Sequence, residues 1–440
     1  MNEKNPKPKL DTQSPDYERV VRAWAMYDWA NSAFAVIILT AVFPVYYRAL
    51  VTNAGGSPEA ATAYWAYTTS ISLLVVAFIG PALGALVDMI GFKKRFLAGA
   101  LALGIVGSVG LAFLGQNTFV LASLIFAVAN FGFAGGNIFY ESLLPQVARA
   151  DDLDRVSALG YALGYLGGGV LLVANAILLL WPEWLGLPGR DFALRACFVS
   201  VAIWWLVFSL PLFREVTEPI AAGHTTLSRS VVWSGLQRLV STLREVRRYR
   251  QLAIFLTAFW LYNDGVSTII KLAAAYGDEI GVRHNDMLIA LVLTQFIGFP
   301  CSIGFGRLAQ YLGAKQAIFV GLAVYGLIST AGFFIRSAWH FYALAIVVGM
   351  VQGGTQALSR SLFATMVPKT RSTEFFGFFS TGEKVAGIIG PAIFGMVGQL
   401  TGNSRWGIIS VTFLFVVGAA LLWQVDEEEG RRVAEASDVP

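Results

Sequence analysis

The residues best placed to do chemistry in this chain are charged side chains inside long apolar runs. Asp28 lies near the start of the first run, and the adjacent residues Glu383 and Lys384 lie within a late one. Charges inside a bilayer are costly and mark transport pathways or proton relays. Glu383 is a candidate proton carrier, and Lys384 could hold a substrate carboxylate. Because adjacent helical residues point in different directions, we expect Glu383 and Lys384 each to have a partner on another helix or water in a cavity. The alternative is that both form structural ion pairs with other spans and take no part in transport.

Three further side chains accompany Asp28 in the first run. Tyr27, Asn31 and Phe34 are spaced i, i+4 and i+7, which places them on one face of a helix. We predict that this face lines a central cavity and that Asp28 binds or couples there. The alternative is that Asp28 lies about one turn inside the membrane and only caps the helix or reaches back to the interface.

The elements that carry these residues are predicted to be membrane spans. The chain has 440 residues, of which 56% are hydrophobic and only 14% charged, whereas an average soluble protein carries about 25% charged residues. A spanning helix needs roughly 20 mostly apolar residues. This window predicts an all-α integral membrane protein with twelve spans, near 23–48, 62–87, 96–115, 118–144, 156–181, 192–213, 252–275, 286–310, 315–335, 339–366, 375–400 and 405–424.

One long connection divides these spans into two bundles of six. The predicted organisation is an N-terminal tail (1–22), a six-helix bundle (23–213), a linker (214–251), a second six-helix bundle (252–424) and an acidic tail (425–440). The linker's later part has helical apolar spacing opposite several arginines, which is typical of a helix lying on an anionic leaflet; a solvated linker helix fits equally well. Most basic residues fall on the side of the termini, which predicts a cell-membrane protein with both termini cytoplasmic.

The two bundles repeat each other in sequence. Gly135-Gly136, Ser142-Leu143 and Gly160 recur at a nearly constant offset as Gly353-Gly354, Ser361-Leu362 and Gly377. A parallel repeat of this kind predicts two pseudo-symmetric halves with a solute site between them at the bilayer midplane, exposed to each side alternately.

The repeat also relates two opposite charges. Glu141 and Arg360 occupy equivalent positions near the cytoplasmic ends of spans four and ten. We predict that they form a gate salt bridge that closes the cytoplasmic side; alternatively, each pairs within its own half. Amides and one acid within spans complete the candidates for substrate binding or coupling: Asn263, Asp264, Gln352 and Gln356. Amides in spans also serve simply to hold helices together.

Two glycine-containing segments have mechanical consequences. Gly387-x2-Gly390-Pro391-x3-Gly395 in span eleven can bend that helix and free a carbonyl. Between spans two and three, Gly84-x3-Asp88-x2-Gly91-x-Lys93-Lys94 resembles the loop signature of the major facilitator superfamily. Its glycines allow a tight turn and close helix approach. Its Asp can sit against a helix N-terminus or a neighbouring Arg, so the loop is expected to latch the cytoplasmic side.

The opening span narrows this resemblance to one branch. Trp24-Ala-Met-Tyr27-Asp28-Trp29-Ala30-Asn31-Ser32-Ala-Phe34 and, in span seven, Tyr262-Asn263-Asp264-Gly265 resemble the vacuolar amino-acid effluxer-like (autophagy-related permease) branch, which has many bacterial members. The resemblance implies the major facilitator fold and secondary, alternating-access export of a small solute, with amino acids as the substrate class. Protons are the candidate coupling ion, and Asp28, Glu141 and Glu383 the titratable candidates. The alternatives are a lipid or lipophile translocator on the same fold and a non-transporting membrane enzyme or solute sensor.

The residue pattern gives little support for nucleotide hydrolysis, metal binding or enzymatic catalysis. The closest approach to a nucleotide-binding loop, Gly377-x4-Gly382, has Glu383 where a Lys is required. The three histidines, His224, His284 and His340, fall in loops. We therefore expect no metal, no cofactor and no enzymatic activity. A net charge of only +4 does not suggest nucleic acid, and we expect a monomer.

Overall fold

The computed structural model describes residues 15–115, 117–218, 248–279, 282–335, 337–387 and 389–438. Within these residues the chain is nearly all helical, and twelve helical segments are long and apolar enough to cross a membrane. This confirms the predicted all-α class and the twelve spans. The linker helix predicted within 214–251 lies outside the described residues.

The first six spans form the N-terminal half. Their helices are α1 (Pro15–Ala33), the π-helical η1 (Phe34–Ala41), α2 (Phe43–Asn53), α3 (Pro58–Ile90), α4 (Lys93–Leu111), α5 (Phe119–Glu141), α6 (Leu144–Val147), α7 (Leu153–Leu180), η2 (Pro182–Leu185) and α8 (Arg190–Glu215). The first span consists of α1, η1 and α2 in succession. In η1 the backbone hydrogen bonds follow the π-helical pattern, and the segment packs against α7 and α8 of its own half.

The remaining spans form the C-terminal half. Their helices are α10 (Arg250–Glu279), α11 (His284–Leu312), α12 (Ala314–Gly332), α13 (Ala338–Thr365), η4 (Lys369–Arg371), α14 (Ser372–Ala386), α15 (Ile389–Thr401), α16 (Ser404–Ser410), α17 (Thr412–Trp423) and α18 (Glu427–Asp438). Span eleven is divided into α14 and α15. Span twelve is likewise divided, into α16 and α17.

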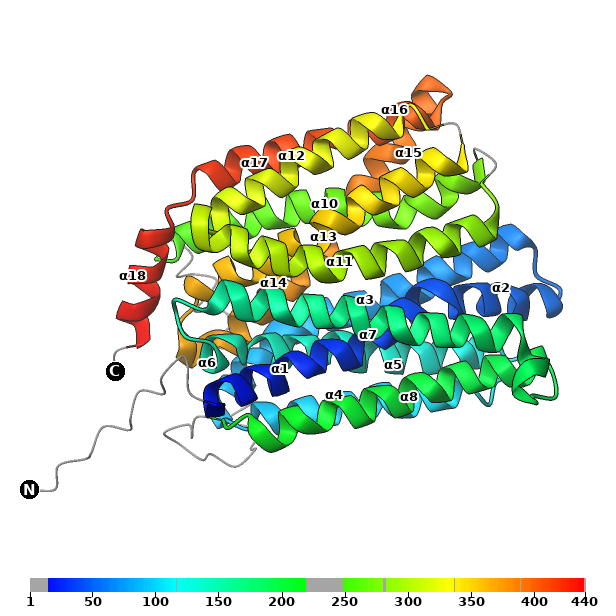
Figure 1. Ribbon diagram of the computed structural model, residues 1–440, viewed down its shortest axis with the longest axis horizontal. Helices are drawn as coiled ribbons and strands as arrows, with labels where there is room; N and C mark the ends of the chain where they lie inside the picture. Colours follow the sequence, from blue (N-terminus) through cyan, green and yellow to red (C-terminus); the bar gives the residue numbers. More distant parts are fainter. Residues whose placement is uncertain are drawn as a thin grey trace, which may run out of the picture.

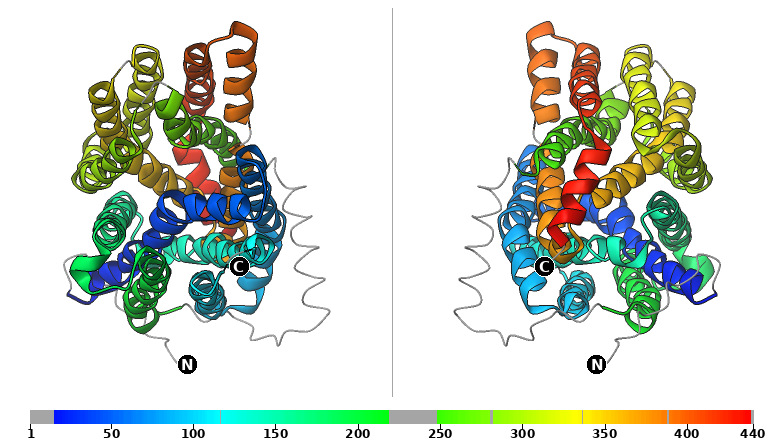
Figure 2. Two further views of the ribbon diagram at one scale, coloured as in Figure 1. Left: turned by 90° about the vertical axis from the view of Figure 1, so that its right-hand side faces the viewer. Right: turned by 90° about the vertical axis from the view of Figure 1, so that its left-hand side faces the viewer.

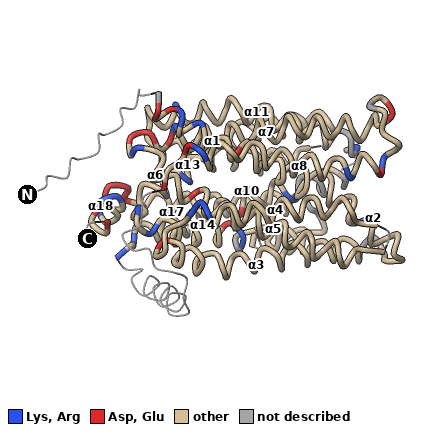
Figure 3. The backbone as a smooth tube through the Cα atoms, turned by 90° about the horizontal axis from the view of Figure 1, so that it is seen from below, with Lys and Arg blue, Asp and Glu red and all other residues tan. Residues whose placement is uncertain are grey.

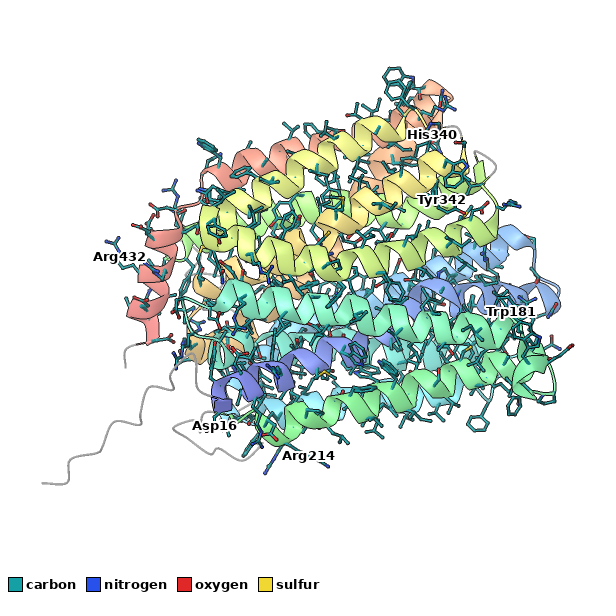
Figure 4. The ribbon with its side chains drawn as sticks, viewed as in Figure 1. Asp16, Trp181, Arg214, His340, Tyr342 and Arg432 are labelled. Carbon is teal, nitrogen blue, oxygen red and sulfur yellow. The ribbon has the colours of Figure 1, made fainter. Side chains whose placement is uncertain are left out.

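The two halves lie side by side with their helices roughly parallel, and both chain ends lie at the same end of the bundle (Figure 1). We call this the termini end and the opposite end the far end. Asp16, Arg214 and Arg432 lie at the termini end, whereas Trp181, His340 and Tyr342 lie at the far end (Figure 4). Charged residues gather at the termini end, and the middle of the bundle carries few (Figure 3).

Between the halves, α3 packs along α14, and α7 packs along α11 and α13. These contacts are close because glycines stand at the crossings. A Cβ atom built on Gly84 would lie 2.3 Å from the carbonyl oxygen of Thr373, and one built on the repeat-related Gly306 would lie 2.6 Å from the Cβ of Ala158. A larger side chain at either position would push the halves apart.

The last helix, α18, lies across the termini end (Figure 2). The carboxylate of Asp438 accepts hydrogen bonds from the backbone N–H groups of Lys369 and Thr370, at 2.8 and 3.0 Å. Gln251 at the start of α10 donates to Glu429 at 2.5 Å and accepts from the N–H of Asp426 at 2.9 Å. The helix therefore supports the connection between α13 and α14, immediately before the contact between the halves.

Candidate functional site

A buried ion pair joins the two halves across their interface. The guanidinium of Arg360 on α13 lies 3.2 Å from Oδ2 of Asp28 on α1, and the Arg360 side chain is only 1% exposed. Tyr140 donates its hydroxyl to the same Asp28 oxygen at 2.8 Å. Arg360 also donates to the hydroxyl and carbonyl oxygens of Ser157 on α7, at 2.9 and 3.0 Å. Removing one member of such a buried pair costs roughly 3–5 kcal/mol.

Aromatic rings complete the surroundings of this guanidinium. The Arg360 guanidinium carbon lies 4.4 Å from the ring centre of Tyr161 and 5.0 Å from that of Trp24. A guanidinium over an aromatic face is attracted by the ring electrons, more strongly where water is excluded. Three helices of the N-terminal half, α1, α5 and α7, thus surround this one residue of the C-terminal half.

The predicted salt bridge between Glu141 and Arg360 is wrong for this conformation. Among the described residues Arg360 pairs with Asp28, while Oε2 of Glu141 is buried without a hydrogen-bond partner. The repeat places Glu141 and Arg360 at equivalent positions along their helices, and both line the base of the cavity. The guanidinium nevertheless points toward α1 and α7, because Arg360 donates to Ser157 and Tyr140 holds the Asp28 carboxylate beside it. Glu141 stays within electrostatic reach of Arg360, Glu383 and Lys384. It lines the cavity described next.

A cavity of about 850 Å³ lies between the halves, from this ion pair toward the far end. Its base carries Asp28, Glu141 and Arg360, and its outer part is lined by residues such as Arg48 of α2 and Met287 of α11. Its middle is polar and is lined by side-chain amides and phenols from both halves: Asn31, Asn137, Gln295, Gln352, Gln356, Tyr161 and Tyr165. Asn31 donates to Asn137 at 2.7 Å. Much of the remaining lining is apolar, with residues such as Val36, Phe133 and Leu291. The site therefore suits a small solute that carries both polar and apolar groups.

The structure brings several predicted site residues together here. Asp28, Asn31, Gln352 and Gln356 all line the cavity. Tyr27 and Phe34 do not, because both are fully buried within the N-terminal half, where Tyr27 packs on Tyr140 with ring centres 4.7 Å apart. The face that meets the cavity runs through Asp28, Ser32 and Ala35, which is rotated by about one residue from the predicted face.

Glu383 and Lys384 pair with each other, contrary to the expectation that neighbouring residues would not. The Lys384 ammonium lies 3.4 Å from Oε2 of Glu383, and neither residue is among those that line the cavity. Both side chains are long enough for their ends to meet although their Cβ atoms diverge. The Lys384 ammonium is therefore already paired with the carboxylate of Glu383 on the same helix.

Asn263 and Asp264 are buried in α10 and are likewise not among the cavity-lining residues. Oδ2 of Asp264 accepts the backbone N–H of Gly390 at 2.7 Å, so the carboxylate caps the start of α15. Pro391 has no N–H, and the carbonyl of Gly387 four residues earlier loses its helical donor. The ammonium of Lys271 donates to that carbonyl at 3.4 Å. The predicted bend and freed carbonyl in span eleven are both present.

The loop between α3 and α4 forms a latch across the halves, as its sequence suggests. Asp88 accepts from the backbone N–H groups of Thr373 and Glu374, at 3.2 and 2.8 Å, in the first turn of α14. Lys93 lies 3.2 Å from Asp88 and donates to Ser372 at 2.6 Å. A carboxylate at a helix N-terminus meets free N–H groups and the positive end of the helix dipole.

The other residues of this motif support the latch. Gly91 adopts a φ of 75°, which glycine allows without strain. Lys94 donates to the carbonyls of Phe213 and Val216 at the end of α8, at 2.8 and 2.5 Å. Nearby, Ser372 of α14 donates to the carbonyl of Ser142 at 3.0 Å, and at the repeat-related place Ser361 donates to Asp154 at 2.5 Å. The termini end is thus closed by matching contacts, while the cavity extends toward the far end.

Several residues of this site were missed by sequence reasoning. Tyr140 and Ser157, which orient the ion pair, are ordinary core residues in the sequence. Lys271 and Arg48 were not chosen as site residues, yet both line the cavity. Their position near the ends of predicted spans could have indicated this, because a long basic side chain at a span end can reach into a cavity between the helices.

Comparison with known proteins agrees with this architecture. Residues 16–435 match the family described as "Vacuole effluxer Atg22 like". The chain is 35% identical over 420 residues to the MFS-type transporter YxiO of Bacillus subtilis, across 95% of this chain and 97% of that protein. It is 25% identical over 424 residues to autophagy-related protein 22 of Saccharomyces cerevisiae, across 84% of this chain and 79% of the relative.

Solved structures show the same fold. The proton:xylose symporter XylE superposes with a TM-score of 0.69 at 15% identity, covering 96% of this chain and 98% of that chain. The major facilitator transporter FucP in its outward conformation superposes with a TM-score of 0.69 at 12% identity, covering 94% of this chain and 100% of that chain. The chain therefore belongs to the vacuole effluxer Atg22-like family and is a multi-pass membrane transporter with the major facilitator fold, not an enzyme.

Proposed function

We propose that this protein exports a small polar solute by alternating access and that amino acids are its substrates. The single observation that carries the proposal is the Asp28–Arg360 ion pair at the base of a cavity between two halves that is lined by both polar and apolar side chains. Because the pair joins helices of different halves, it must break for the termini end to open. The conformation described here is then the one open toward the far end.

The amino-acid assignment rests on the family and on the chemistry of the cavity. The matching family is described as an effluxer, and the opening span resembles its amino-acid-exporting branch. The cavity offers cations, carboxylates and amides within one small volume. A zwitterion with a polar or small side chain can satisfy such a set, whereas a lipid tail would leave these polar groups unpaired.

We place the termini in the cytoplasm of a cell that carries this protein in its plasma membrane. The excess of Lys and Arg on the termini side of the predicted spans supports this orientation, and Figure 3 shows basic residues gathered at that end. The far end, toward which the cavity extends, then faces outward. The conformation described is in that case outward-open, and the latch from Asp88 to α14 closes the cytoplasmic side.

Glu141 is our proposed proton-binding group. It lines the cavity base, is 7% exposed, and one of its oxygens has no hydrogen-bond partner. Asp28 and Glu383, the other candidates, are each engaged by a cation within 3.4 Å. A buried carboxylate without such a partner is stabilised by taking up a proton, because burial disfavours its charged form.

Counterflow in proteoliposomes tests this function. Vesicles loaded with one unlabelled amino acid should accumulate its labelled form, and a pH gradient should alter the rate. The matched control is Arg360→Gln, which should lose exchange while remaining inserted. Absence of exchange for all twenty amino acids would overturn the substrate assignment, and an unchanged rate under a pH gradient would overturn the proton coupling.

A further inference from the structure

Lys271 touches two features of the structure that are otherwise separate. Its ammonium donates to the carbonyl of Gly387 at the break between α14 and α15. The same side chain is solvent-exposed and lines the cavity. At 3.4 Å the hydrogen bond is near the upper limit of length and hence weak. Lys271 can therefore exchange this partner for a stronger one without a large cost.

The charges that line the cavity determine which partner this would be. Among the residues that the structure describes, five charged side chains do so, and two of them, Asp28 and Arg360, neutralise each other. Glu141 is almost fully buried. The two charges left exposed to a solute are those of Lys271 and Arg48, and both are cationic. The accessible part of the cavity thus attracts an anionic group, while its amides can satisfy neutral polar groups.

Lys271 contributes one hydrogen bond at the break in span eleven. Pro391 deprives the Gly387 carbonyl of its helical donor, and the Lys271 ammonium replaces that donor. Asp264 caps the other side of the break through Gly390. If Lys271 leaves, the Gly387 carbonyl loses its protein donor, and of these two polar contacts at the break only the Asp264 cap remains. Asp264 and Lys384 are the other charges within electrostatic reach of Lys271.

We propose that Lys271 binds the anionic group of the transported solute and that it does so by leaving the Gly387 carbonyl, which links solute binding to bending of span eleven. This inference rests on the proposed function, because it takes the cavity as the transport site. A hydrogen bond between an ammonium and a carboxylate is stronger than one between an ammonium and a neutral carbonyl, so a carboxylate in the cavity draws Lys271 away. Lys384, the lysine that the sequence favoured for this role, is held by Glu383.

The bend is measured within the C-terminal half by double electron–electron resonance. Spin labels are placed at Trp339→Cys on α13 and Leu400→Cys on α15, two exposed positions, in full-length protein in nanodiscs with Cys197→Ala and Cys301→Ala. Lys271→Gln should shift or broaden the ligand-free distance distribution. Arg48→Gln, which removes the other exposed cation but does not touch the break, should leave it unchanged. An unchanged distribution in Lys271→Gln overturns the link to span eleven.

The anion is tested with an amino acid and its amide, which differ in the charge of the carboxyl group. The probe is the amino acid with the fastest counterflow. The Kd of the amino acid should rise by about tenfold or more in Lys271→Gln. In Lys271→Arg the Kd should return close to the wild-type value. The amide should bind wild type and Lys271→Gln with the same Kd. Equal affinity of wild type and Lys271→Gln for the acid overturns the role of Lys271.

The two proposals can fail separately. If no amino acid exchanges, the substrate assignment is wrong, and the same comparison is made with the short-chain monocarboxylates acetate, propionate and lactate. Saturating anion should then move the wild-type distance distribution toward that of Lys271→Gln. A wild-type distribution that responds to no carboxylate, with or without an amino group, overturns the role of Lys271.

Discussion

The carboxylate of Asp28 and the guanidinium of Arg360 lie 3.2 Å apart, although 332 residues separate them in the chain. One belongs to the first span and the other to the tenth, so their contact holds the two halves together at the base of the cavity. Tyr140 and Ser157 fix its geometry through 2.8 and 2.9 Å hydrogen bonds. The conformational preference of the transporter should therefore depend on this pair.

Neutralising either member should open the termini end. In Asp28→Asn or Arg360→Gln the remaining charge is buried without its partner, which costs roughly 3–5 kcal/mol in the closed arrangement. A cysteine introduced at Ser361, which is fully buried, should then react faster with an impermeant maleimide applied from the termini side. The exchanged pair Asp28→Arg with Arg360→Asp should recover part of the protection. Labelling rates equal to the parent in both single variants would contradict the gate.

Replacing Glu141 should abolish proton coupling without lowering the stability of the fold. Glu141→Gln removes a buried, partly unpartnered carboxylate at nearly constant volume, so thermal unfolding in detergent should occur at the same or a higher temperature. The dependence of counterflow on pH should disappear. Glu383→Gln serves as the comparison, because it leaves Lys384 without its 3.4 Å partner and should lower stability. If Glu141→Gln keeps the parental pH profile, the proton binds elsewhere.

A side chain at Gly84 should disrupt the latch. A Cβ there would meet the Thr373 carbonyl oxygen at 2.3 Å, so Gly84→Val must push α3 and α14 apart at a cost of about 1–3 kcal/mol. The expected result is faster labelling of the Ser361→Cys reporter. Gly99→Val is the matched control, because nothing lies within 4 Å of a Cβ at that position. Equal labelling in the two valine variants would show that this contact does not keep the termini end closed.

Removing the cap at the helix break should destabilise the C-terminal half. Asp264→Ala leaves the Gly390 N–H without its 2.7 Å acceptor, and a buried unsatisfied donor costs roughly 1–3 kcal/mol. Asp264→Asn keeps an acceptor oxygen and should unfold at a temperature between those of the alanine variant and the parent. Thermal unfolding of the purified protein measures this order. An alanine variant as stable as the parent would mean that α15 does not need the cap.

Features that depend on neighbours in the chain were predictable. A span is recognised by roughly 20 consecutive apolar residues, because the bilayer requires each helix to satisfy its own backbone and to expose apolar side chains. The bend at Pro391 was predictable for the same reason, since proline removes one specified hydrogen bond. The latch at Asp88 was expected because its loop resembles the major facilitator loop signature.

The partners of the buried charges were not predictable, because they depend on helix rotation. Successive residues of a helix differ by about 100° in direction, so a shift of one position moved the cavity face from Tyr27 and Phe34 to Asp28 and Ala35. The pairing of Arg360 with Asp28 instead of Glu141 has the same origin. Packing of α1 against α7 and α8 sets that rotation.

The sequence by itself determined how many helices cross the membrane, how the two halves repeat, and which few charges lie among apolar residues. These properties follow from local hydrophobicity and from the cost of burying a charge. Only the tertiary structure decided that Arg360 meets Asp28, that Lys384 is held by Glu383, and that Lys271 reaches both the cavity and Gly387. Contacts between distant helices depend on the packing of all of them together, and no local pattern of residues specifies it.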